Sequence, residues 1–208
     1  SNMHYHPYAF TNKDGEPTLV ATDKAYQYSM YGLMPSFYDV LLVNKYYNCF
    51  EAKCKGVSVN CQNGGVQNVN NCRACTCPTG YGGNDCSSTD SKFKKLQASA
   101  SPKAEELKVG NGVGRMADHT TVDFYVIEAP QGKRVELTIS EVNNRVNTID
   151  CLYGGMQIWT KKDTRMSGFK VCAKEQAEKY YLSEGEKIFI KIWNRYGTST
   201  FKFSHRSG

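Results

Sequence analysis

The sequence lacks several features that would point to common classes of protein. It has no run of about 18 apolar residues, so we expect no membrane-spanning helix. It has neither a phosphate-binding loop nor a dinucleotide fingerprint, which argues against a nucleotide-dependent enzyme. It has no internal repeat and no low-complexity tract. No secretory leader is visible, but the chain starts at Ser1 inside a motif, so a missing leader carries little weight.

Histidine is scarce, and the histidines that are present do not have the spacing of a catalytic zinc site. They are His4, His6, His119 and His205. Catalytic zinc needs three protein ligands and a water, and two of the ligands usually come from H-E-x-x-H on one helix face. No two of these histidines have that spacing. We expect His119 and His205 at the surface, and a surface or packing role for His6.

Cysteine, in contrast, is abundant. The chain has nine cysteines, seven of them between Cys49 and Cys86. This density suits an oxidising compartment, because a short region with little core needs covalent cross-links. The alternative is a structural zinc site that uses the pair Cys72-x-x-Cys75, but the spacings fit a disulfide module better. Since nine is odd, one thiol should pair outside the chain or stay free.

Charge is unevenly distributed along the chain. Residues 1–86 carry six basic and six acidic residues, whereas residues 87–208 carry 20 and 14 and therefore the whole net charge of +6. A basic module can attract acidic glycans, anionic membranes or acidic partners. The simpler interpretation is a solvated surface, because the charges alternate with apolar residues. Nucleic acid is not expected as a partner of such a disulfide-rich chain.

Two motifs stand in the first 50 residues. The chain opens on S-x-M-H-Y, from Ser1 to Tyr5. Further on, Ser36 is followed three residues later by Asp39, the pattern of a capping box at a helix N-terminus. The apolar residues that follow go round most of the predicted helix, so we expect the helix to be largely buried and to end at Asn48.

The next segment is a compact cysteine pattern followed by polar residues. Its spacing is Cys54-x6-Cys61-x10-Cys72-x2-Cys75-x1-Cys77-x8-Cys86. Glycines near the last cysteines suit tight turns with positive φ. Six cysteines allow 15 pairings, and the sequence alone does not choose among them. Residues 87–92 are expected to be a polar linker.

From about Phe93 onward the pattern changes to strands. Apolar and polar residues alternate in several runs, and turn signals separate the runs. The inward-facing apolar positions are Val135, Leu137, Ile139, Ile188, Ile190, Ile192, Phe201 and Phe203. Alternation with period two predicts an antiparallel β-sandwich with one face of each sheet in the core.

Together these segments resemble the C-terminal portion of a nematode-type astacin, a metzincin zinc endopeptidase. S-x-M-H-Y is similar to the family's Met-turn with its tyrosine, 54–86 to an EGF-like module, and the remainder to a divergent CUB domain. The resemblance implies a multi-domain chain. Its parts are an irregular α+β remnant of the metzincin C-terminal subdomain at 1–49, a small disulfide-rich EGF-like module at 54–86, and an all-β antiparallel CUB-like sandwich at 92–208.

The resemblance also implies roles for residues of the first motif. Met3 would lie beneath the zinc as an apolar floor, without binding it. Tyr5 would be a fifth zinc ligand in the resting enzyme and would hydrogen-bond the tetrahedral transition state, which a phenol can do. The family's zinc helix, H-E-x-x-H-x-x-G-x-x-H, is absent from this sequence. Zinc is thus expected as the cofactor of the parent enzyme, and no tightly bound cofactor is expected for this chain alone.

Disulfide pairing follows from the same resemblance. It implies the pairs Cys54–Cys72, Cys61–Cys75, Cys77–Cys86 and Cys151–Cys172. It leaves Cys49 unpaired, because its counterpart in the family bridges to a cysteine near the start of the peptidase domain.

Other CUB features are implied or absent. The run from Phe124 to Leu137 looks like the paired early strands of a CUB domain. Gly155 stands where CUB domains often carry a calcium-binding Asp, and the residues before Cys54 lack the acidic cluster of calcium-binding EGF modules. Calcium is therefore not expected in either module.

The function implied by the resemblance is secreted, zinc-dependent endoproteolysis of extracellular proteins or peptides. As a fragment without the zinc helix, this chain is expected to be inactive on its own. The EGF-like and CUB-like modules would bind extracellular matrix or cell-surface proteins. The alternative is a non-catalytic extracellular binding protein that acts through its EGF–CUB unit.

Overall fold

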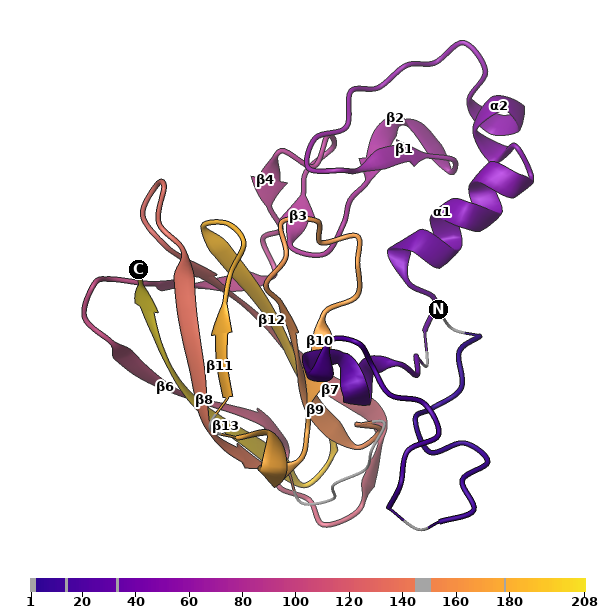
Figure 1. Ribbon diagram of the computed structural model, residues 1–208. Helices are drawn as coiled ribbons and strands as arrows, with labels where there is room; N and C mark the ends of the chain where they lie inside the picture. Colours follow the sequence, from indigo (N-terminus) through magenta and orange to yellow (C-terminus); the bar gives the residue numbers. More distant parts are fainter. Residues whose placement is uncertain (1–2, 14, 33, 145–150, 178) are drawn as a thin grey trace.

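The computed structural model describes residues 3–13, 15–32, 34–144, 151–177 and 179–208. Figure 1 shows three regions: an N-terminal segment with short helices, a small cysteine-rich module, and a large two-sheet sandwich. The described part is rich in strands and carries four disulfides. The expected multi-domain, disulfide-rich, β-rich fold is therefore confirmed.

The described N-terminal residues form helices and turns, with no strand before the cysteine-rich module. A 3₁₀ helix, η1, spans Lys24–Ser29, and helix α1 spans Phe37–Tyr46. The capping box is confirmed at the start of α1: Ser36 Oγ accepts from Asp39 N, and Ser36 N donates to Asp39 Oδ2 at 2.9 Å. After α1 the chain takes a left-handed conformation and enters a second helix, α2, at Cys49–Cys54, which the sequence did not predict.

The expectation that α1 is largely buried was wrong. Within α1, which is described throughout, Leu41 is buried, whereas Leu42 is 68% and Tyr46 is 77% exposed. A helix that is apolar all round needs packing partners on every side. Here α1 contacts α2 and one loop of the sandwich. The apolar pattern therefore indicates surface that is suited to burial, and most of that surface is accessible in this chain.

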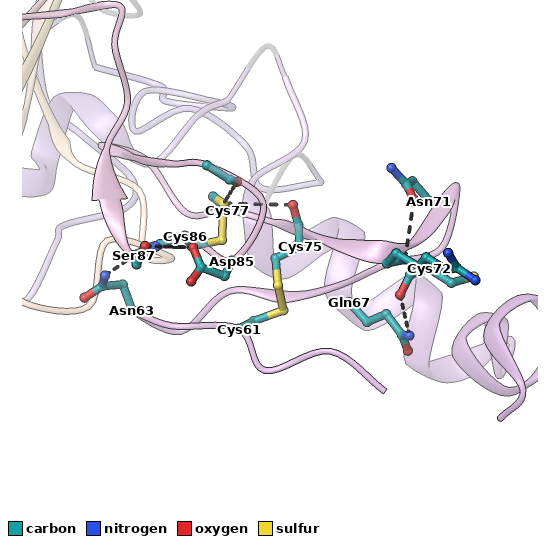
Figure 2. Close-up of a disulfide and its surroundings, with 12 residues drawn as sticks. Cys61, Asn63, Gln67, Asn71, Cys72, Cys75, Cys77, Asp85, Cys86 and Ser87 are labelled. Carbon is teal, nitrogen blue, oxygen red and sulfur yellow. Dashed lines mark hydrogen bonds between the residues drawn. A yellow bond between two sulfur atoms is a disulfide. The ribbon is translucent and has the colours of Figure 1, made fainter. Parts of the chain in front are cut away.

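The cysteine-rich module is cross-linked by three disulfides, Cys54–Cys72, Cys61–Cys75 and Cys77–Cys86. These are the pairs implied by the resemblance to an EGF-like module. Backbone bonds reinforce them, such as the one from Cys75 N to the carbonyl of Asn84 at 2.7 Å. Figure 2 shows Asn63 beside Cys86, where its Nδ2 donates to the carbonyl of Cys86 at 2.8 Å. The strands of the module are β1 (Val66–Asn68), β2 (Asn71–Thr76) and β3 (Tyr81–Gly82), and β4 (Ser88–Thr89) follows the module.

The segment 87–92 is not a free linker, contrary to the prediction. Its strand β4 pairs with β3 of the module. Asp90 N then donates to the carbonyl of Gly80 at 3.0 Å, and Phe93 N donates to the carbonyl of Asp90. The polar composition suggested a flexible connection, but its backbone groups find partners in the module. The EGF-like module therefore runs directly into the first strand of the sandwich.

In the described part of the chain, the sandwich consists of a five-stranded sheet, in the order β10-β9-β12-β7-β5, and a four-stranded sheet, in the order β11-β8-β13-β6. Neighbouring strands are antiparallel, except that β5 pairs parallel to β7. A short 3₁₀ helix, η2, lies between β10 and β11. The bounds are β5 Phe93–Gln97, β6 Lys103–Gly110, β7 Met116–Glu128, β8 Val135–Asn143, β9 Gly154–Trp159, β10 Phe169–Val171, η2 Lys174–Gln176, β11 Lys179–Leu182, β12 Lys187–Tyr196 and β13 Thr198–Ser207.

The core lies between the two sheets, where sequence alternation placed it. Ile188, Ile190 and Ile192 of β12 are fully buried together with the inward residues of β8. The predicted alternation is therefore confirmed. Phe189 points to the opposite face of its sheet but is also buried, because Tyr81 of the EGF-like module packs on its ring at 5.5 Å.

The pairing of the early strands was predicted wrongly. Phe124 lies in β7 of the five-stranded sheet and Leu137 in β8 of the four-stranded sheet, so the two strands are not neighbours. β7 pairs with β12 and β5, whereas β8 pairs with β13 and β11. The residues around Pro130 carry the chain from one sheet to the other. Alternation shows which face of a strand is buried, and it does not identify the neighbouring strand.

His205 also departs from the prediction, because it lies in the core and not at the surface. It follows Phe201 and Phe203 on the inward face of β13, with 1% of its surface exposed. Its Nε2 lies 3.5 Å from Glu105 Oε1, and burial lowers the pKa of the imidazole. His119 is exposed on β7, as predicted.

Candidate functional site

The motif at the N-terminus is presented to solvent. Met3 is 88% and Tyr5 62% exposed, and the Tyr5 ring meets Phe10 edge-on at 5.2 Å. The segment is held by turns, including a bond from Ala9 N to the carbonyl of His6. Ser1 and Asn2, which begin the motif, lie outside the described residues. The phenol of Tyr5 is therefore accessible to groups from outside the described chain.

The described residues do not provide a zinc site of their own. In the ranges that the structure covers, no three His, Cys, Asp or Glu side chains gather closely enough to hold a metal ion. A catalytic zinc takes three protein ligands. Tyr5 alone cannot hold zinc, so a zinc site beside it would need histidines from elsewhere in a longer protein.

A cavity of about 730 Å³, here called the N-terminal cleft, lies between residues 3–39 and the outer face of the five-stranded sheet. Figure 1 shows the N-terminal segment running along the side of the sandwich formed by β9 and β10. The N-terminal segment contributes His4, Tyr31 and Tyr38, among others, to the lining, and the sheet contributes Lys191 and Trp193. The cleft therefore lies between His4 of the S-x-M-H-Y motif and the sandwich.

Contacts at β10 hold the N-terminal segment in place. Asp23 caps η1 by accepting from Ala25 N. At the other end of η1, Ser29 Oγ accepts from Lys170 N at 2.6 Å, and Lys170 Nζ donates to the carbonyl of Tyr31 at 2.9 Å. Tyr26 packs edge-on against Phe169 at 5.9 Å between ring centres. The segment is thus docked through both polar and aromatic contacts.

A second docking point joins α1 to the loop between β9 and β10. Tyr38 Oη donates to Asp163 Oδ2 at 2.8 Å, while Arg165 Nε donates to Asp163 Oδ1, also at 2.8 Å. Hydrogen bonds from Arg165, and then from Tyr38, lower the pKa of Asp163 to about 2. The Arg165 guanidinium also lies over the Tyr38 ring, 5.3 Å from its centre.

A second hollow, the module groove, lies between the EGF-like module and the same outer sheet face and measures about 510 Å³. Tyr81 and Asp90 contribute from the module side and the segment after it; Phe124, Trp159 and Lys191 contribute from the sheet. The module approaches the sheet closely: a Cβ on Gly80 would lie 2.5 Å from the Phe189 ring. Only glycine permits this contact, and its φ of +93° also favours glycine.

Gly155 occupies the position at which the resemblance would place a calcium-binding Asp. A Cβ there would lie 2.6 Å from the Trp193 ring, so the bare glycine makes room for the indole. Trp193 Nε1 donates to the carbonyl of Cys151 at 2.9 Å. Cys151 in turn pairs with Cys172, the fourth disulfide implied by the resemblance. This site thus packs an aromatic side chain over the first residues of β9.

Cys49 is the cysteine left over when the eight others pair. It begins α2, is partly exposed, and belongs to none of the disulfides in the described chain. Cys49 is therefore unpaired among the described residues, and it is also the cysteine that the resemblance leaves unpaired.

Sequence comparisons connect the chain to named proteins. It is 30% identical over 209 residues to zinc metalloproteinase nas-31 of Caenorhabditis elegans, which matches all of this chain and 34% of the relative. It is 33% identical to nas-29 over 94% of this chain and 37% of the relative, and 34% identical to nas-23 over 92% and 36%. The chain is homologous to the C-terminal part of nematode astacin zinc metalloproteinases. It spans about a third of the length of these astacin relatives.

Other comparisons are less specific. No family model matches the chain. Among solved structures, the CUB1-EGF-CUB2 domains of rat MASP-1 align with a TM-score of 0.40 at 13% identity, over 56% of this chain and 42% of that one. The CUB1-EGF-CUB2 domain of human MASP-1/3 aligns with a TM-score of 0.35 at 14% identity, over 74% of this chain and 57% of that one. In the described part of the chain, no helix is long and apolar enough to cross a membrane.

The sequence did not single out the outer-face residues Lys191 and Trp193 as a site. Both fall on the outward side of the alternation that predicts Ile188, Ile190 and Ile192 as inward, and the structure places them on that outer face. Their neighbours across the sheet come from strands far away in the sequence, such as Gln157 of β9 and Phe124 of β7. A signal was present in Trp193 itself, because a large aromatic residue on a solvent face usually has something to pack against.

Proposed function

We propose that this chain is the distal part of an extracellular zinc metalloendopeptidase that cleaves proteins or peptides. The observation that carries the proposal is the similarity to astacin metalloproteinases, which runs from one end of this chain to the other. The disulfide-rich construction supports a secreted, oxidising location. We propose the division into 1–49, the end of the peptidase domain, 54–86, the EGF-like module, and 92–208, the CUB-like sandwich.

Within that enzyme, Tyr5 and Met3 are the residues of this chain that belong to the peptidase site. Met3 would form an apolar floor, and Tyr5 would be the catalytic residue, whose phenol oxygen could bind the resting metal and whose O–H could donate to the transition state. The zinc itself is held by histidines of the parent protein. The high exposure of both side chains supports this proposal, because it leaves them accessible to a zinc-bearing part of the protein.

The accessible apolar surface of α1 also supports the proposal. Leu42, Val43 and Tyr46 are all more than half exposed. Burial of a side chain of this size is worth about 1.5–3 kcal/mol, so a helix with several of them exposed is suited to packing against further protein. We assign that role to the body of the peptidase domain.

The second candidate is a non-catalytic extracellular binding protein. The described chain favours it in one respect, since it has grooves at its module boundaries and no cluster of metal ligands. The two candidates differ in what precedes the Ser1 codon in the transcript. An in-frame H-E-x-x-H-x-x-G-x-x-H supports the enzyme. A start codon and secretory leader directly before Ser1 would overturn it and leave the binding protein.

A direct assay tests the role of Tyr5. A chimera joins the zinc-bearing part of nas-31 to this chain at Ser1, and cleavage of a protein substrate is measured with and without a zinc chelator. We expect chelator-sensitive cleavage that falls about 100-fold in kcat for Tyr5→Phe, the size of effect seen when one transition-state donor is removed. Tyr8→Phe serves as the matched control, and purified residues 1–208 should not cleave. Chelator-sensitive cleavage by residues 1–208 alone, or full activity of Tyr5→Phe, would contradict the proposal.

A further inference from the structure

We propose that the outer face of the five-stranded sheet binds an extended acidic peptide segment of a protein partner, with Lys191 as the main contact for its carboxylates. The site is the strip between the EGF-like module and the N-terminal segment. The inference deepens the proposed function, because it rests on the role of the EGF–CUB unit in binding proteins and names the chemistry of the partner.

The strip follows one row of the sheet, and its accessible part ends at Phe124, because Phe93 beyond it is buried. Strand register places Lys170, Gln157, Lys191, Phe124 and Phe93 in one row on the same face, with one residue from each of the five strands. Successive residues of such a row are about 5 Å apart. Gln157 and Lys191 line both the N-terminal cleft and the module groove, so the two hollows meet at the centre of the row. An extended chain laid along the row passes through both.

Lys191 gives the strip its charge. Lys191 is half-buried, and burial, reinforced by the positive charge of Lys92, lowers the pKa of its amine. It forms no ion pair with any residue that the structure describes, and its Nζ lies 5.7 Å from the centre of the Trp193 ring. A partly desolvated ammonium without a counter-charge is unfavourable, and a carboxylate from a partner relieves it.

Acidic side chains around the strip are already occupied. Asp90, in the module groove, forms an ion pair with Lys92 at 2.8 Å. Asp39, in the N-terminal cleft, accepts from the backbone and hydroxyl of Ser36 at the start of α1. Lys92 and Asp90 therefore balance in the module groove, as Lys170 and Asp39 do in the N-terminal cleft, and the charge left for a ligand in both hollows is the positive charge of Lys191, which is complementary to carboxylates.

Aromatic side chains beside the charge favour a peptide as the occupant. Phe124 lies directly opposite Lys191 in the register, with Trp159 in the module groove and Trp193 in the N-terminal cleft. Such surfaces accept apolar or aromatic side chains. A sulfated glycan would be better served by a dense array of basic groups, whereas here the cations are few and are separated by a glutamine and aromatic rings. The combination fits a peptide in which Glu or Asp alternates with large apolar residues.

Fluorescence anisotropy with the full chain tests the proposal. The probe is a short fluorescein-labelled peptide of alternating Glu and Tyr, and its matched partner has Gln in place of every Glu. We expect the acidic peptide to bind and the Gln peptide to bind at least about tenfold more weakly. Lys191→Gln should weaken binding of the acidic peptide about tenfold, because it removes one charge-assisted contact. Lys191→Arg should restore most of it.

Lys202→Gln is the matched control. Lys202 lies on β13 of the other sheet, where it pairs with Glu141 at 2.7 Å, so its removal should leave binding unchanged. Circular dichroism and the melting temperature of each variant verify folding. No binding, equal binding of the two peptides, or unchanged binding by Lys191→Gln would overturn the proposal. So would preferential binding of a heparin oligosaccharide that the peptide does not displace. Since no proteolysis is measured, failure here leaves the peptidase proposal intact.

Discussion

Two glycines of this chain are required by the close approach of an aromatic ring, and not by the secondary structure in which they lie. Gly80 and Gly155 each lie against an aromatic ring at a distance that no side chain permits. The sequence marks Gly80, because the EGF-like pattern places glycine there. The role of Gly155 depends on Trp193, a residue 38 positions away in the sequence, so no local pattern could reveal it.

Gly80→Ala should destabilise the chain strongly. The new Cβ meets the Phe189 ring at 2.5 Å and sits at a φ of +93°, so both overpacking and backbone strain act, at about 2–4 kcal/mol in total. Gly132→Ala is the matched control, because its φ is +76° but nothing lies within 4 Å of its Cβ. Urea unfolding of both variants should show a loss of only about 1 kcal/mol for Gly132→Ala. Equal losses for the two variants would mean that contact with Phe189 contributes nothing.

His205 should make stability depend on pH. Burial lowers its pKa in the folded chain below the ordinary value of 6.5, although Glu105 works in the opposite direction. A base with a lowered folded pKa is favourable to folding above its unfolded pKa, and that contribution is lost as the pH falls below it. We therefore expect the free energy of unfolding to decrease between about pH 7 and pH 5. His205→Leu should flatten this slope, whereas His119→Leu, at an exposed site, should keep it. A slope that persists in His205→Leu would assign it to other groups.

At the scale of elements, the sequence predicted faces well and neighbours poorly. The inward residues of β8, β12 and β13 are where alternation placed them. Extending the same alternation by one step from Phe203 would also have placed His205 inward. The separation of β7 and β8 into different sheets could not be predicted in this way, because period two carries no information about pairing. Segment 87–92 was misjudged for a related reason: composition reports polarity, whereas strand β4 forms through backbone bonds.

The docking of α1 on the sandwich should weaken in acid. Asp163 accepts from Arg165 and Tyr38, and its pKa of about 2 lies below the ordinary 3.8. A carboxyl with a lowered folded pKa stabilises the contact above about pH 4, and the contribution is lost as the pH falls through about 2. Amide hydrogen exchange of α1, corrected for its intrinsic pH dependence, should accelerate over that range. Asp163→Asn should accelerate it already at neutral pH.

Asp123→Asn provides the comparison for this experiment. Asp123 forms an ion pair with Lys94 at 2.7 Å, between β7 and β5, whereas the hydrogen bond from Tyr38 of α1 goes to Asp163. Its removal should leave exchange in α1 unchanged. If Asp163→Asn also leaves it unchanged, then the hydrogen bond from Tyr38 does not hold the helix.

At the scale of the whole molecule, eight cysteines close four internal links and one remains. Intact-mass analysis after alkylation without reduction should show a single adduct, and peptide mapping should place it on Cys49, which is partly exposed. Reduction before alkylation should add eight more. A bridge between Cys49 and another cysteine of this chain would contradict the pairing. In a longer parent protein the same thiol should be protected from the reagent by its partner.

Sequence motifs point most clearly to the proposed peptidase portion, yet this chain contains only a short piece of that portion. S-x-M-H-Y resembles the Met-turn of the family, and in the proposal above its partners in catalysis are zinc ligands from outside these 208 residues. The strip around Lys191 is the opposite case. Every residue of it is present, but it exists only because five strands from separate parts of the sequence lie side by side.

Strand β4 pairs with β3 of the EGF-like module and leads within a few residues into β5, and this short connection has a consequence for substrate selection. Because backbone hydrogen bonds hold the segment between the EGF-like module and the sandwich, a partner bound at the strip would lie at a fixed distance and direction from the N-terminal motif. The EGF-like module and the sandwich would then fix the distance between the strip and the N-terminal motif. Among proteins with suitable acidic segments, those cleaved would be the ones whose susceptible bond lies the right number of residues from the anchor.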